Sequence, residues 1–568
     1  MIESHQGNIA LRWANTFFKH LSSSGVQHVV ISPGSRSTPL TLAAAINPRL
    51  KKQVILDERS AAFTALGIGK ATNMPAALIC TSGTALANYH PAVIEARQSG
   101  VPLILATADR PPHLHATGAN QAIDQLKIFG DYPVFFQNVG EPQTGDKDIK
   151  RLRMLAQQSV SISREKRGPV HLNFPFRKPL EPTTDYQQKI QQEYIKSNDD
   201  SEGHTPEVST GITLDDSFQQ QISSAQKPLI IVGPLAPGDD TTSIVELANK
   251  INAPILSEPS ISSQQVIHSF AGFLRNESLR TQLAPDMILR FGFQPTDKSL
   301  ELALDQWSPN HHVHFASTTS WQDATLSNSQ RIAWMGKKFS TTGISSQTKS
   351  QWSNQWKDAA KQFASHYRNI ISQKNTLTDG VIYHRLTPQL TDQHFVMASN
   401  SFPARDIHLF GEQASNIPLF VNRGASGIDG ITSTAMGISR GLQKSGVLFT
   451  GDLAFLHDTN ALLNHRNMEQ SLAIVVINNN GGSIFRMLPI ANNQKHFETY
   501  FETPQQANIN KLAETYDIPY HSVETISALN KIDLPEFLST NHGLSILECK
   551  TNPDASMELR KKLWDFQP

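Results

Sequence analysis

The stretch Gly451-Asp452-Leu453, followed later by Asn478-Asn479-Asn480-Gly481-Gly482, decides the fold of this 568-residue chain. Each segment follows an apolar, strand-like run, Val447-Leu448-Phe449 in the first case and 472–477 in the second. Two neighbouring parallel strands would bring Asp452 and Asn479 to one carboxyl edge of a sheet, where open α/β sheets bind ligands. A carboxylate, a carboxamide oxygen and a backbone carbonyl suit Mg²⁺, whose octahedral shell phosphate oxygens can complete. The alternative is two ordinary turns, because Asn and Gly are common turn residues.

The overall composition limits the classes of function. Lys plus Arg and Asp plus Glu both number 50, so no global field favours nucleic acid or an anionic membrane. Cys80 and Cys549 are the only cysteines, which leaves no disulfide framework and no cysteine-rich metal site. The start, Met1 to Leu21, is typical of an amphipathic helix and lacks the apolar core of a signal peptide, and no apolar run is long enough to span a bilayer. We therefore expect a soluble cytoplasmic protein.

Short apolar runs alternate with helix-length segments, which predicts parallel sheets flanked by helices. We expect an α/β fold of three doubly wound domains with mainly parallel sheets, at residues 1–185, 205–345 and 375–555. The polar stretches from Thr183 to Lys227 and from Lys337 to Lys374 look like connectors, the second with helical spacing toward its end. The expected strands are 28–31, 53–56, 77–80, 102–106, 170–174, 229–232, 254–256, 287–291, 312–315, 395–398, 418–421, 447–449, 472–477 and 544–548.

Polar motifs end several strands of the first third. Ser35 and Arg36 follow Gly34 at a strand-to-helix turn that suits an anion, and Gly34 permits an unusual backbone angle there. The alternative is an N-capped helix start. Arg110 could form a forked pair with a carboxylate, or it could pair locally with Asp109.

Other motifs also allow two interpretations. Glu58 lies in Asp57-Glu58-Arg59, which is either a functional carboxylate at a strand end or a surface ion pair. Ile428, among the small residues of 422–430, is either a functional wedge or an apolar plug under a glycine loop. The run His311-His312-Val313-His314 has no Cys or carboxylate partner close in sequence, so we expect packed or exposed histidines and not a metal site.

Taken together, these segments resemble one family. The 27-residue spacing from Asp452 to Asn479 resembles the thiamine-diphosphate signature, although the residue after Gly-Asp is usually Gly and here is Leu453. The Arg-bearing motifs narrow the resemblance to the 2-succinyl-5-enolpyruvyl-6-hydroxy-3-cyclohexene-1-carboxylate synthases, enzymes of menaquinone biosynthesis with a pyruvate oxidase/decarboxylase-like architecture. The motifs that carry it are 33–39, 57–59, 81–85, 107–111, 422–430 and 478–485.

The resemblance implies a carboligase, a transferase that decarboxylates 2-oxoglutarate and adds the resulting carbanion to isochorismate. Thiamine diphosphate would act as the electron sink. Glu58 would be the catalytic residue that hydrogen-bonds the cofactor's aminopyrimidine, a task that needs a carboxyl pKa raised by desolvation. Ile428 would hold the two cofactor rings in a bent arrangement. Asp452, Asn479 and the carbonyl of Gly481 would bind Mg²⁺, or Mn²⁺ in its place.

The resemblance also implies the full set of contacts. The implied cofactor contacts are Glu58, Ser82, Gly83, Ser401, Ser426, Gly427, Ile428, Asp452, Leu453, Asn479, Gly481 and Ile484. The implied contacts to the two dicarboxylate substrates are Ser35, Arg36, Arg110, Gln121, Lys298, Ser401, Arg405, Arg423, Ile484 and Phe485. The cofactor would lie between the pyrimidine-binding domain, 1–185, of one subunit and the diphosphate-binding domain, 375–555, of another, in a homodimer or homotetramer. The family commonly has a Lys-Arg pair where this chain has Lys298-Ser299, so one charge of the central domain is absent there.

Two other functions fit parts of the sequence. Another thiamine-diphosphate enzyme, a 2-oxo-acid decarboxylase or an acetohydroxyacid synthase-like carboligase, would favour pyruvate-like substrates and leave Arg405 and Arg423 with structural roles. A non-catalytic regulator that binds a nucleotide or diphosphate would suit the plain central block, but it would leave the candidate base, metal ligands and wedge unexplained.

Overall fold

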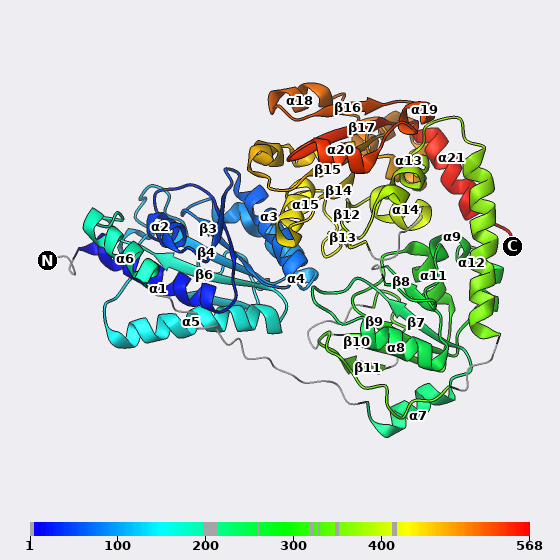
Figure 1. The fold of residues 1–568 in the computed structure, drawn as a ribbon, viewed down its shortest axis with the longest axis horizontal. Helices are drawn as coiled ribbons and strands as arrows, with labels where there is room; N and C mark the ends of the chain where they lie inside the picture. The colour runs from blue at the N-terminus through cyan, green and yellow to red at the C-terminus, as the bar shows by residue number, and fades with distance from the viewer. Residues whose placement is uncertain are drawn as a thin grey trace. The chain divides into compact units, whose positions relative to one another are not determined.

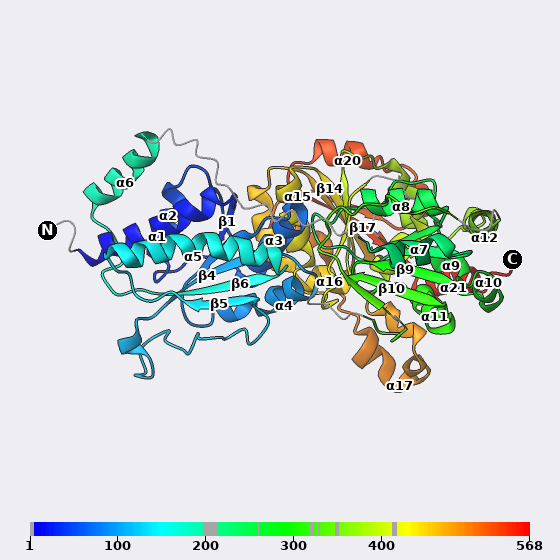
Figure 2. The same ribbon diagram turned by 90° about the horizontal axis from the view of Figure 1, so that it is seen from below.

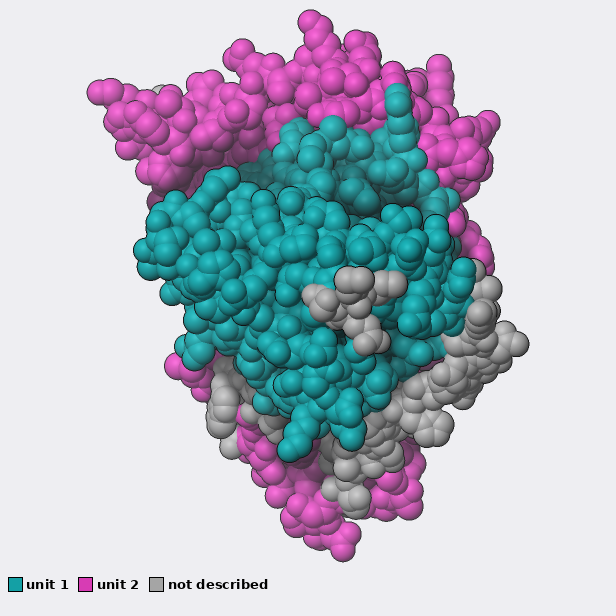
Figure 3. Space-filling model, turned by 90° about the vertical axis from the view of Figure 1, so that its left-hand side faces the viewer, with its two compact units in different colours: residues 1–207, 424–443, 457–469 teal, residues 208–423, 444–456, 470–568 magenta. Residues whose placement is uncertain are grey.

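The computed structural model describes residues 5–196, 214–258, 261–316, 323–327, 330–346, 351–411 and 417–568 (Figure 1). The chain divides into two compact units, coloured separately in Figure 3. The first contains residues 1–207, 424–443 and 457–469, and the second contains 208–423, 444–456 and 470–568. The first unit therefore combines the N-terminal third of the chain with two short segments from its C-terminal third.

A six-stranded parallel sheet forms the centre of the first unit, with the strand order β2-β1-β3-β4-β6-β5. Its strands are β1 (His28–Ile31), β2 (Lys51–Val54), β3 (Ala76–Cys80), β4 (Leu103–Asp109), β5 (Phe135–Asn138) and β6 (Pro169–Pro175). Its helices include α1 (Gln6–Ser23), α2 (Thr38–Ile46), α3 (Glu58–Thr72), α4 (His90–Gln98), α5 (Asp146–Glu165) and α6 (Thr184–Lys196). The central strands β3, β4 and β6 are buried along their whole length, as expected for a sheet covered on both faces.

Two separate hydrophobic cores cover the two faces of this sheet. Helices α1, α2 and α5 contribute to one core, and α3 and α4 contribute to the other. Helix α1 turns Leu11, Ala14, Phe17, Phe18 and Leu21 inward, which confirms the amphipathic helix expected at the start of the chain. Helices α1 and α5 lie side by side along the sheet in both ribbon views (Figures 1 and 2).

Helix α3 is unusual because every residue from Ser60 to Gly69 is buried. It packs lengthwise against α15 (Ile431–Leu442), which the C-terminal part of the chain supplies to the first unit. Glycines allow the close approach, since a Cβ on Gly67 would lie 2.1 Å from the carbonyl oxygen of Thr434. A Cβ on Gly437 would lie 2.0 Å from the carbonyl oxygen of Thr64. The first unit therefore includes a helix, α15, that lies far in sequence from the N-terminal residues it packs against.

The second unit contains two further parallel sheets. The five-stranded sheet has the order β11-β10-β9-β7-β8, and the six-stranded sheet has the order β13-β12-β14-β15-β17-β16. The five strands are β7 (Pro228–Val232), β8 (Ile255–Ser257), β9 (Met287–Phe291), β10 (His311–Ala316) and β11 (Gln330–Ala333). The six strands are β12 (Phe395–Ala398), β13 (Leu419–Val421), β14 (Gly446–Gly451), β15 (Leu472–Asn478), β16 (Tyr520–Val523) and β17 (Leu544–Lys550). Three parallel α/β sheets confirm the predicted fold class.

Helices flank both sheets of the second unit. Around the five-stranded sheet lie α7 (Asp216–Ser224), α8 (Thr242–Ile251), α9 (Phe270–Phe273), α10 (Glu277–Gln282), α11 (Lys298–Gln306) and α12 (Trp352–Ser372). The rest of the unit contains α13 (Asp379–Leu386), α14 (Phe402–Phe410), α16 (Asp452–His457), α17 (Gln494–Phe497), α18 (Ile509–Thr515), α19 (Ile526–Leu529), α20 (Leu534–Thr540) and α21 (Pro553–Trp564), of which α16 ends at the unit boundary. One continuous hydrophobic core joins both sheets through α12, with Trp352, Trp356 and Phe363 buried in it.

Some predicted elements were wrong in detail. The second strand is β2 at 51–54 and not 53–56, and Leu56 is 67 % exposed. Strands β5, β11 and β16 were not predicted; each lies at a sheet edge, is only partly buried and contains polar residues. The connector predicted from Thr183 to Lys227 contains α6 and α7 at its ends, and residues 197–213 of it lie outside the described part. The second connector contains the 21-residue helix α12, in agreement with the helical spacing near its end.

No helix in the described part of the chain combines the length and the apolar character needed to cross a bilayer.

Candidate active site

In all three sheets the strand order reverses beside the first strand of the sheet. These reversal points lie between β1 and β3, between β7 and β9, and between β12 and β14. Open α/β sheets bind ligands in the crevice at such a point, outside the carboxyl ends of the strands. The loops after β1 and β3 carry Arg36 and Ser82, and the loops after β12 and β14 carry Ser401 and Asp452. The sequence-predicted residues therefore lie at the positions where this topology favours binding.

In the first unit, Arg110 contacts two other predicted residues, Ser82 and Gln121. Its Nη1 donates to Ser82 Oγ at 2.6 Å, its Nη2 donates to Gln121 Oε1 at 3.2 Å, and its Nε donates to the carbonyl of Asn120 at 3.1 Å. Asp109 instead accepts from the backbone N–H of Arg110 at 2.7 Å, so the guanidinium is directed to the loop and not to Asp109. Gln121 has a left-handed backbone with φ of 54°, which is uncommon for a residue with a side chain and often marks a functional loop.

Arg36 is a second buried guanidinium in the same region. Its Nη1 donates to the carbonyl of Phe176 at 2.7 Å. Burial lowers the pKa of Arg36 and the positive charge of Arg110 lowers it further, while Asp109 opposes that shift. Two guanidiniums that repel each other favour an anionic ligand with two acceptor groups. Gly34 does not use the positive φ that glycine permits; a glycine is required there because a Cβ would lie 2.3 Å from the Cβ of Thr81.

Glu58 is the first residue of α3 and is partly buried. Burial raises its pKa, and the neighbouring charge of Asp57 adds to the increase, which is the direction that a proton-sharing carboxyl requires. Asp57 is the N-cap of α3 and accepts from the backbone N–H of Arg59 at 2.8 Å. Arg59 donates through Nη2 to the carbonyl of His457 at 2.7 Å, and neither Asp57 nor Glu58 forms an ion pair with it among the contacts of these described residues. Glu58 therefore lies at the N-terminus of a helix that is already capped by another residue.

The loop that contains Ser426, Gly427 and Ile428 also belongs to the first unit. Its entry is held by Glu95 on α4, whose two carboxylate oxygens accept from the backbone N–H groups of Gly424 at 3.0 Å and Ala425 at 2.7 Å. Lys70 on α3 approaches Glu95 Oε1 at 3.4 Å, and both side chains are almost fully buried. The buried Lys70–Glu95 pair therefore fixes the start of the loop, and Ile428 further along it is partly exposed.

In the second unit, β14 and β15 are parallel neighbours, with Gly451 opposite Ile477. Asp452 and Asn479 therefore follow adjacent strand ends, as the sequence predicted. The Asp452 carboxylate accepts from the backbone N–H groups of Leu453 and Gly481, and burial raises its pKa to about 7. Asn479 donates through Nδ2 to Asp379 Oδ2 at 3.3 Å, while its Oδ1 is buried and has no hydrogen-bond partner. A buried carboxylate without a compensating charge and an unpartnered amide oxygen fit a hard divalent cation.

Asn479 is hydrogen-bonded to a buried ionic network that consists of Asp379, Asp406 and Arg560. Arg560 on α21 donates to Asp379 Oδ2 at 2.7 Å and to Asp406 Oδ1 at 3.0 Å, and its guanidinium stacks on the ring of Phe402 at 3.6 Å. Asp379 also accepts from the hydroxyls of Thr551 at 2.6 Å and Ser556 at 3.0 Å. The Asp379 carboxylate is fixed by Arg560, Thr551 and Ser556. It therefore holds the NH₂ group of Asn479 in place and leaves the Asn479 amide oxygen without a hydrogen-bond partner among the described residues.

Ser401, Arg405 and Arg423 lie near the end of β12. Ser401 has φ of 75° and ψ of −136° at the start of α14, a conformation that is strained for a residue with a side chain. Arg405 donates through Nη1 to the carbonyl of Ser401 at 2.7 Å, and Arg423 donates to Asn400 Oδ1 at 3.3 Å. Ile484 and Phe485 follow Gly481 in a short 3₁₀ segment and are partly buried. The structure thus places a strained serine, two arginines and an apolar pair in the same unit as the candidate metal ligands.

The Lys298-Ser299 motif beside the five-stranded sheet offers fewer charged groups for a substrate than its resemblance to the family implied. Lys298 is 51 % exposed and forms an ion pair with Glu301 at 2.6 Å, while Ser299 is buried and bonded to Asp297. Arg275 is a cation that the sequence did not single out. The positive charge of Arg405 contributes to lowering its pKa, after burial, and its guanidinium lies over the ring of Trp564 at 4.3 Å.

Comparisons with known proteins agree with this geometry. Family models match three parts of the chain: the N-terminal binding domain of thiamine pyrophosphate enzymes at residues 11–128, their middle domain at 185–397 and their C-terminal binding domain at 419–549. A curated protein of Haloquadratum walsbyi is 35 % identical, with 97 % of each chain covered. Relatives from Geobacillus kaustophilus, 37 % identical, and Listeria innocua, 34 % identical, cover at least 96 % of both chains. All three are named 2-succinyl-5-enolpyruvyl-6-hydroxy-3-cyclohexene-1-carboxylate synthase.

The chain belongs to the 2-succinyl-5-enolpyruvyl-6-hydroxy-3-cyclohexene-1-carboxylate synthase family. It is a thiamine-diphosphate enzyme, as the resemblance of the motifs indicated. Among the described residues, no group of three His, Cys, Asp or Glu side chains is arranged to hold a metal ion. The candidate set in this synthase differs in composition, since it combines one carboxylate with one carboxamide and one backbone carbonyl.

Sequence reasoning missed the residues that support the site in this member of the synthase family. Glu95, Lys70, Asp379 and Arg560 carry no motif and lie far in sequence from the residues they hold. Their only sequence signal is a charged residue inside a helix that is otherwise apolar on its buried side, a pattern shared by many surface residues.

Proposed function

We propose that this protein decarboxylates 2-oxoglutarate and joins the remaining four-carbon fragment to isochorismate, which gives 2-succinyl-5-enolpyruvyl-6-hydroxy-3-cyclohexene-1-carboxylate for menaquinone biosynthesis. The observation that carries this proposal is the similarity to the synthases over 97 % of the chain, combined with the buried arginines at the strand ends. Thiamine diphosphate, when bound, supplies the electron sink for the loss of carbon dioxide. A cytoplasmic location and three domains near 1–185, 205–345 and 375–555 are part of the same proposal.

Each group of residues then has a defined task. Asp452, Asn479 and the carbonyl of Gly481 hold Mg²⁺ or Mn²⁺, and Ser401, Leu453 and Ile484 complete the cofactor contacts in the second unit. Glu58 holds a proton at the cofactor's aminopyrimidine, with Ser82 and Gly83 close by in the first unit. Ser426, Gly427 and Ile428 form the loop that positions the cofactor rings. The raised pKa of Glu58 supports its assignment, because a carboxyl that holds its proton more tightly than usual is better suited to share it with the cofactor.

Charged groups bind the substrates. Arg36 and Arg110 form one pair of guanidiniums for a dicarboxylate, with Ser35 and Gln121 as additional donors. Arg405 and Arg423 form a second pair beside Ser401, with Lys298 as a further cation, and Ile484 and Phe485 supply an apolar wall. Two separate pairs of arginines match two substrates that are both dicarboxylates.

We also propose a homodimer or homotetramer in which the pyrimidine-binding domain of one subunit completes the site of another. Large apolar residues are exposed beside candidate site residues in the single chain: Leu56 next to Glu58, Ile123 and Leu126 next to Gln121, and Met487 and Leu488 next to Phe485. Apolar side chains that are exposed beside a binding site commonly mark an interface.

The first test is isochorismate consumption by the purified protein with Mg²⁺ and thiamine diphosphate, with and without 2-oxoglutarate. We expect consumption only when the cofactor and 2-oxoglutarate are both present. Carbon dioxide release from pyruvate without loss of isochorismate would instead identify another decarboxylase or an acetohydroxyacid synthase-like enzyme. In that case Arg405→Ala and Arg423→Ala would leave the substrate preference unchanged.

The shared site is tested by complementation between inactive variants. Glu58→Gln and Asn479→Ala are purified separately and then mixed under conditions that exchange subunits. If each site uses Glu58 of one subunit and Asn479 of the other, mixed dimers regain one intact site, and about a quarter of the normal activity returns. If each site belongs to one chain, the mixture stays inactive.

A further inference from the structure

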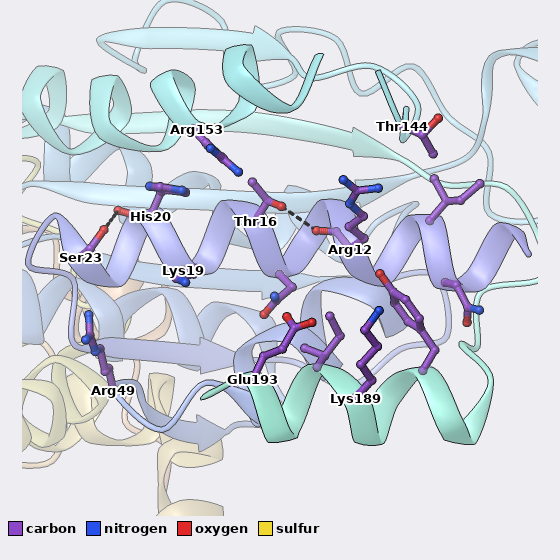
Figure 4. A pocket seen from close by; sticks show the side chains of 15 residues that line it. Arg12, Thr16, Lys19, His20, Ser23, Arg49, Thr144, Arg153, Lys189 and Glu193 are labelled. Atoms are coloured by element: carbon purple, nitrogen blue, oxygen red, sulfur yellow. Dashed lines mark hydrogen bonds between the residues drawn. The ribbon is translucent and has the colours of Figure 1, made fainter. Parts of the chain in front are cut away.

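The first unit has a hollow of about 600 Å³ that includes none of the residues assigned to the proposed active site. It lies over α1, between α5 on one side and α6 on the other (Figure 4). Arg12, Thr16, Lys19 and Ser23 follow one another at spacings of three and four, so they share one face of α1 and span about 16 Å. Arg153 from α5 and Lys189 from α6 point toward that face.

Both ends of α6 are tied to α1, so the hollow is a built feature of the fold. Tyr194 donates its hydroxyl to Asn15 Oδ1 at 2.8 Å near one end. The backbone N–H of Thr183, just before α6, donates to Asn8 Oδ1 at 2.8 Å at the other. Ile190, between them, is buried. These contacts fix α6, which forms one wall of the hollow, against α1, which forms its floor.

The lining is strongly cationic in a chain of zero net charge. Five residues carry permanent positive charges, and Glu193 is the single carboxylate among the lining residues; the five are Arg12, Lys19, Arg49, Arg153 and Lys189. In the described part of the chain, no ion pair joins Arg12, Lys19, Arg153 or Lys189 to a carboxylate. The pKa of His20 is lowered by burial and then by Arg153 and Lys19, which is consistent with a positive potential inside the hollow.

The lining also has an apolar side. Ile9, Ile190 and the ring of Tyr186 lie among the lining residues near the charged groups. Like charges collected without counter-charges cost folding free energy unless a ligand neutralises them. A dicarboxylate would neutralise two of the four lining cations that form no ion pair with a described carboxylate, whereas a chain of phosphates carries three or more charges in a compact length. Arginine forks are well suited to phosphate oxygens.

We propose that the hollow over α1 binds a small phosphorylated metabolite, with its phosphate groups on Arg12, Lys19 and Arg153 and its organic body beside Tyr186 and Ile190. This site is separate from the proposed catalytic residues and does not depend on their assignment.

The test is calorimetric titration of the full-length protein with ATP, in the presence of saturating thiamine diphosphate and Mg²⁺ so that the cofactor's diphosphate site is filled. We expect one saturable site whose dissociation constant rises with salt concentration. Arg12→Glu combined with Arg153→Glu should raise that constant at least twentyfold. The matched control, Lys147→Glu with Arg151→Glu, makes the same charge change at exposed positions of α5 outside the lining and should alter it less than twofold.

Three results would overturn the proposal. They are no saturable binding at millimolar ATP, equal weakening in both double variants, and citrate binding more tightly than ATP. If the charge reversals impair folding, periodate-oxidised ATP labels lysines of the unmodified protein, followed by borohydride reduction and peptide mapping. The reactive aldehydes are on the ribose, so Lys189, on the same helix as Tyr186 and Ile190, should carry the label and be protected by excess ATP, and label confined to lysines outside the lining would contradict the assigned site.

Discussion

Replacing Glu95 by Gln tests how the wedge loop is held. Glu95 accepts two backbone N–H groups at the start of that loop and faces Lys70 inside the first unit. The substitution keeps the shape but replaces one acceptor oxygen by a donor NH₂ and leaves the buried charge of Lys70 without its partner. Breaking one side of a buried pair costs about 3–5 kcal/mol, so the urea midpoint should fall clearly.

The second variant separates the charge from the hydrogen bonds. Lys70→Met with Glu95→Gln removes both charges and leaves only weakened hydrogen bonds, which cost about 1 kcal/mol each. The double variant should therefore be more stable than Glu95→Gln alone by about 2–4 kcal/mol. Burial lowers the pKa of Lys70, and the negative charge of Glu95 opposes that shift. The Glu95 charge therefore stabilises the protonated lysine.

The loop should report the same change through the cofactor. Once Gly424 and Ala425 are released, Ile428 is no longer held, and the half-saturating concentration of thiamine diphosphate should rise at least tenfold, equivalent to about 1.4 kcal/mol. Glu165→Gln, at an exposed position of α5, is the control. Unchanged half-saturation in Glu95→Gln, or a double variant with the summed losses of both single variants, would refute this reasoning.

Three other perturbations follow from the structure. Glu58→Gln should lower turnover by about 10²–10⁴-fold while cofactor binding measured by calorimetry changes little, because only the proton-sharing group is lost; near-normal turnover would remove Glu58 from its role. Arg560→Met leaves Asp379 and Asp406 buried without their common cation, so urea unfolding should show a loss of about 3–5 kcal/mol, and a loss below 1 kcal/mol would mean that the network is not stabilising. Burial raises the pKa of Glu258 to about 7, above its ordinary 4.5, so the folded state binds the proton more tightly and its contribution to stability declines as pH rises from about 4.5 to about 7. Glu258→Gln should remove a decline of about 3 kcal/mol, measured as urea midpoints at pH 5 and pH 8, and parallel pH profiles in both proteins would contradict it.

The cofactor end of the site could be predicted because it depends on short-range patterns. Asp452 and Asn479 each follow a buried strand directly, and parallel strands bring their carboxyl ends to one edge whatever the rest of the chain does. Arg110 and Ser82 were found for the same reason. The exact role of each of these residues stays a prediction.

The support of the site could not be predicted, because it depends on pairing between distant segments. Nothing near Asn479 in the sequence indicates Asp379 or Arg560, and nothing near Ile428 indicates Glu95. The missed strands have a related cause: Gln330–Ala333 and Tyr520–Val523 lie at sheet edges, where one neighbour is enough and polar residues are tolerated. Helix α6 was missed because its outer face is Gln-rich and exposed, although Ile190 is buried.

The packing of α3 against α15 also has a consequence for the synthesis of the protein. Helix α3, with its unbroken run of buried residues, emerges from the ribosome roughly 360 residues before its partner, which takes about 20 to 70 s at typical elongation rates. During that interval the nascent chain carries an apolar helix surface rich in alanine and glycine that nothing nearby in sequence can cover. We therefore expect truncated chains that stop before residue 431 to bind chaperones or aggregate, and full-length translation to be the step after which the N-terminal third becomes resistant to protease.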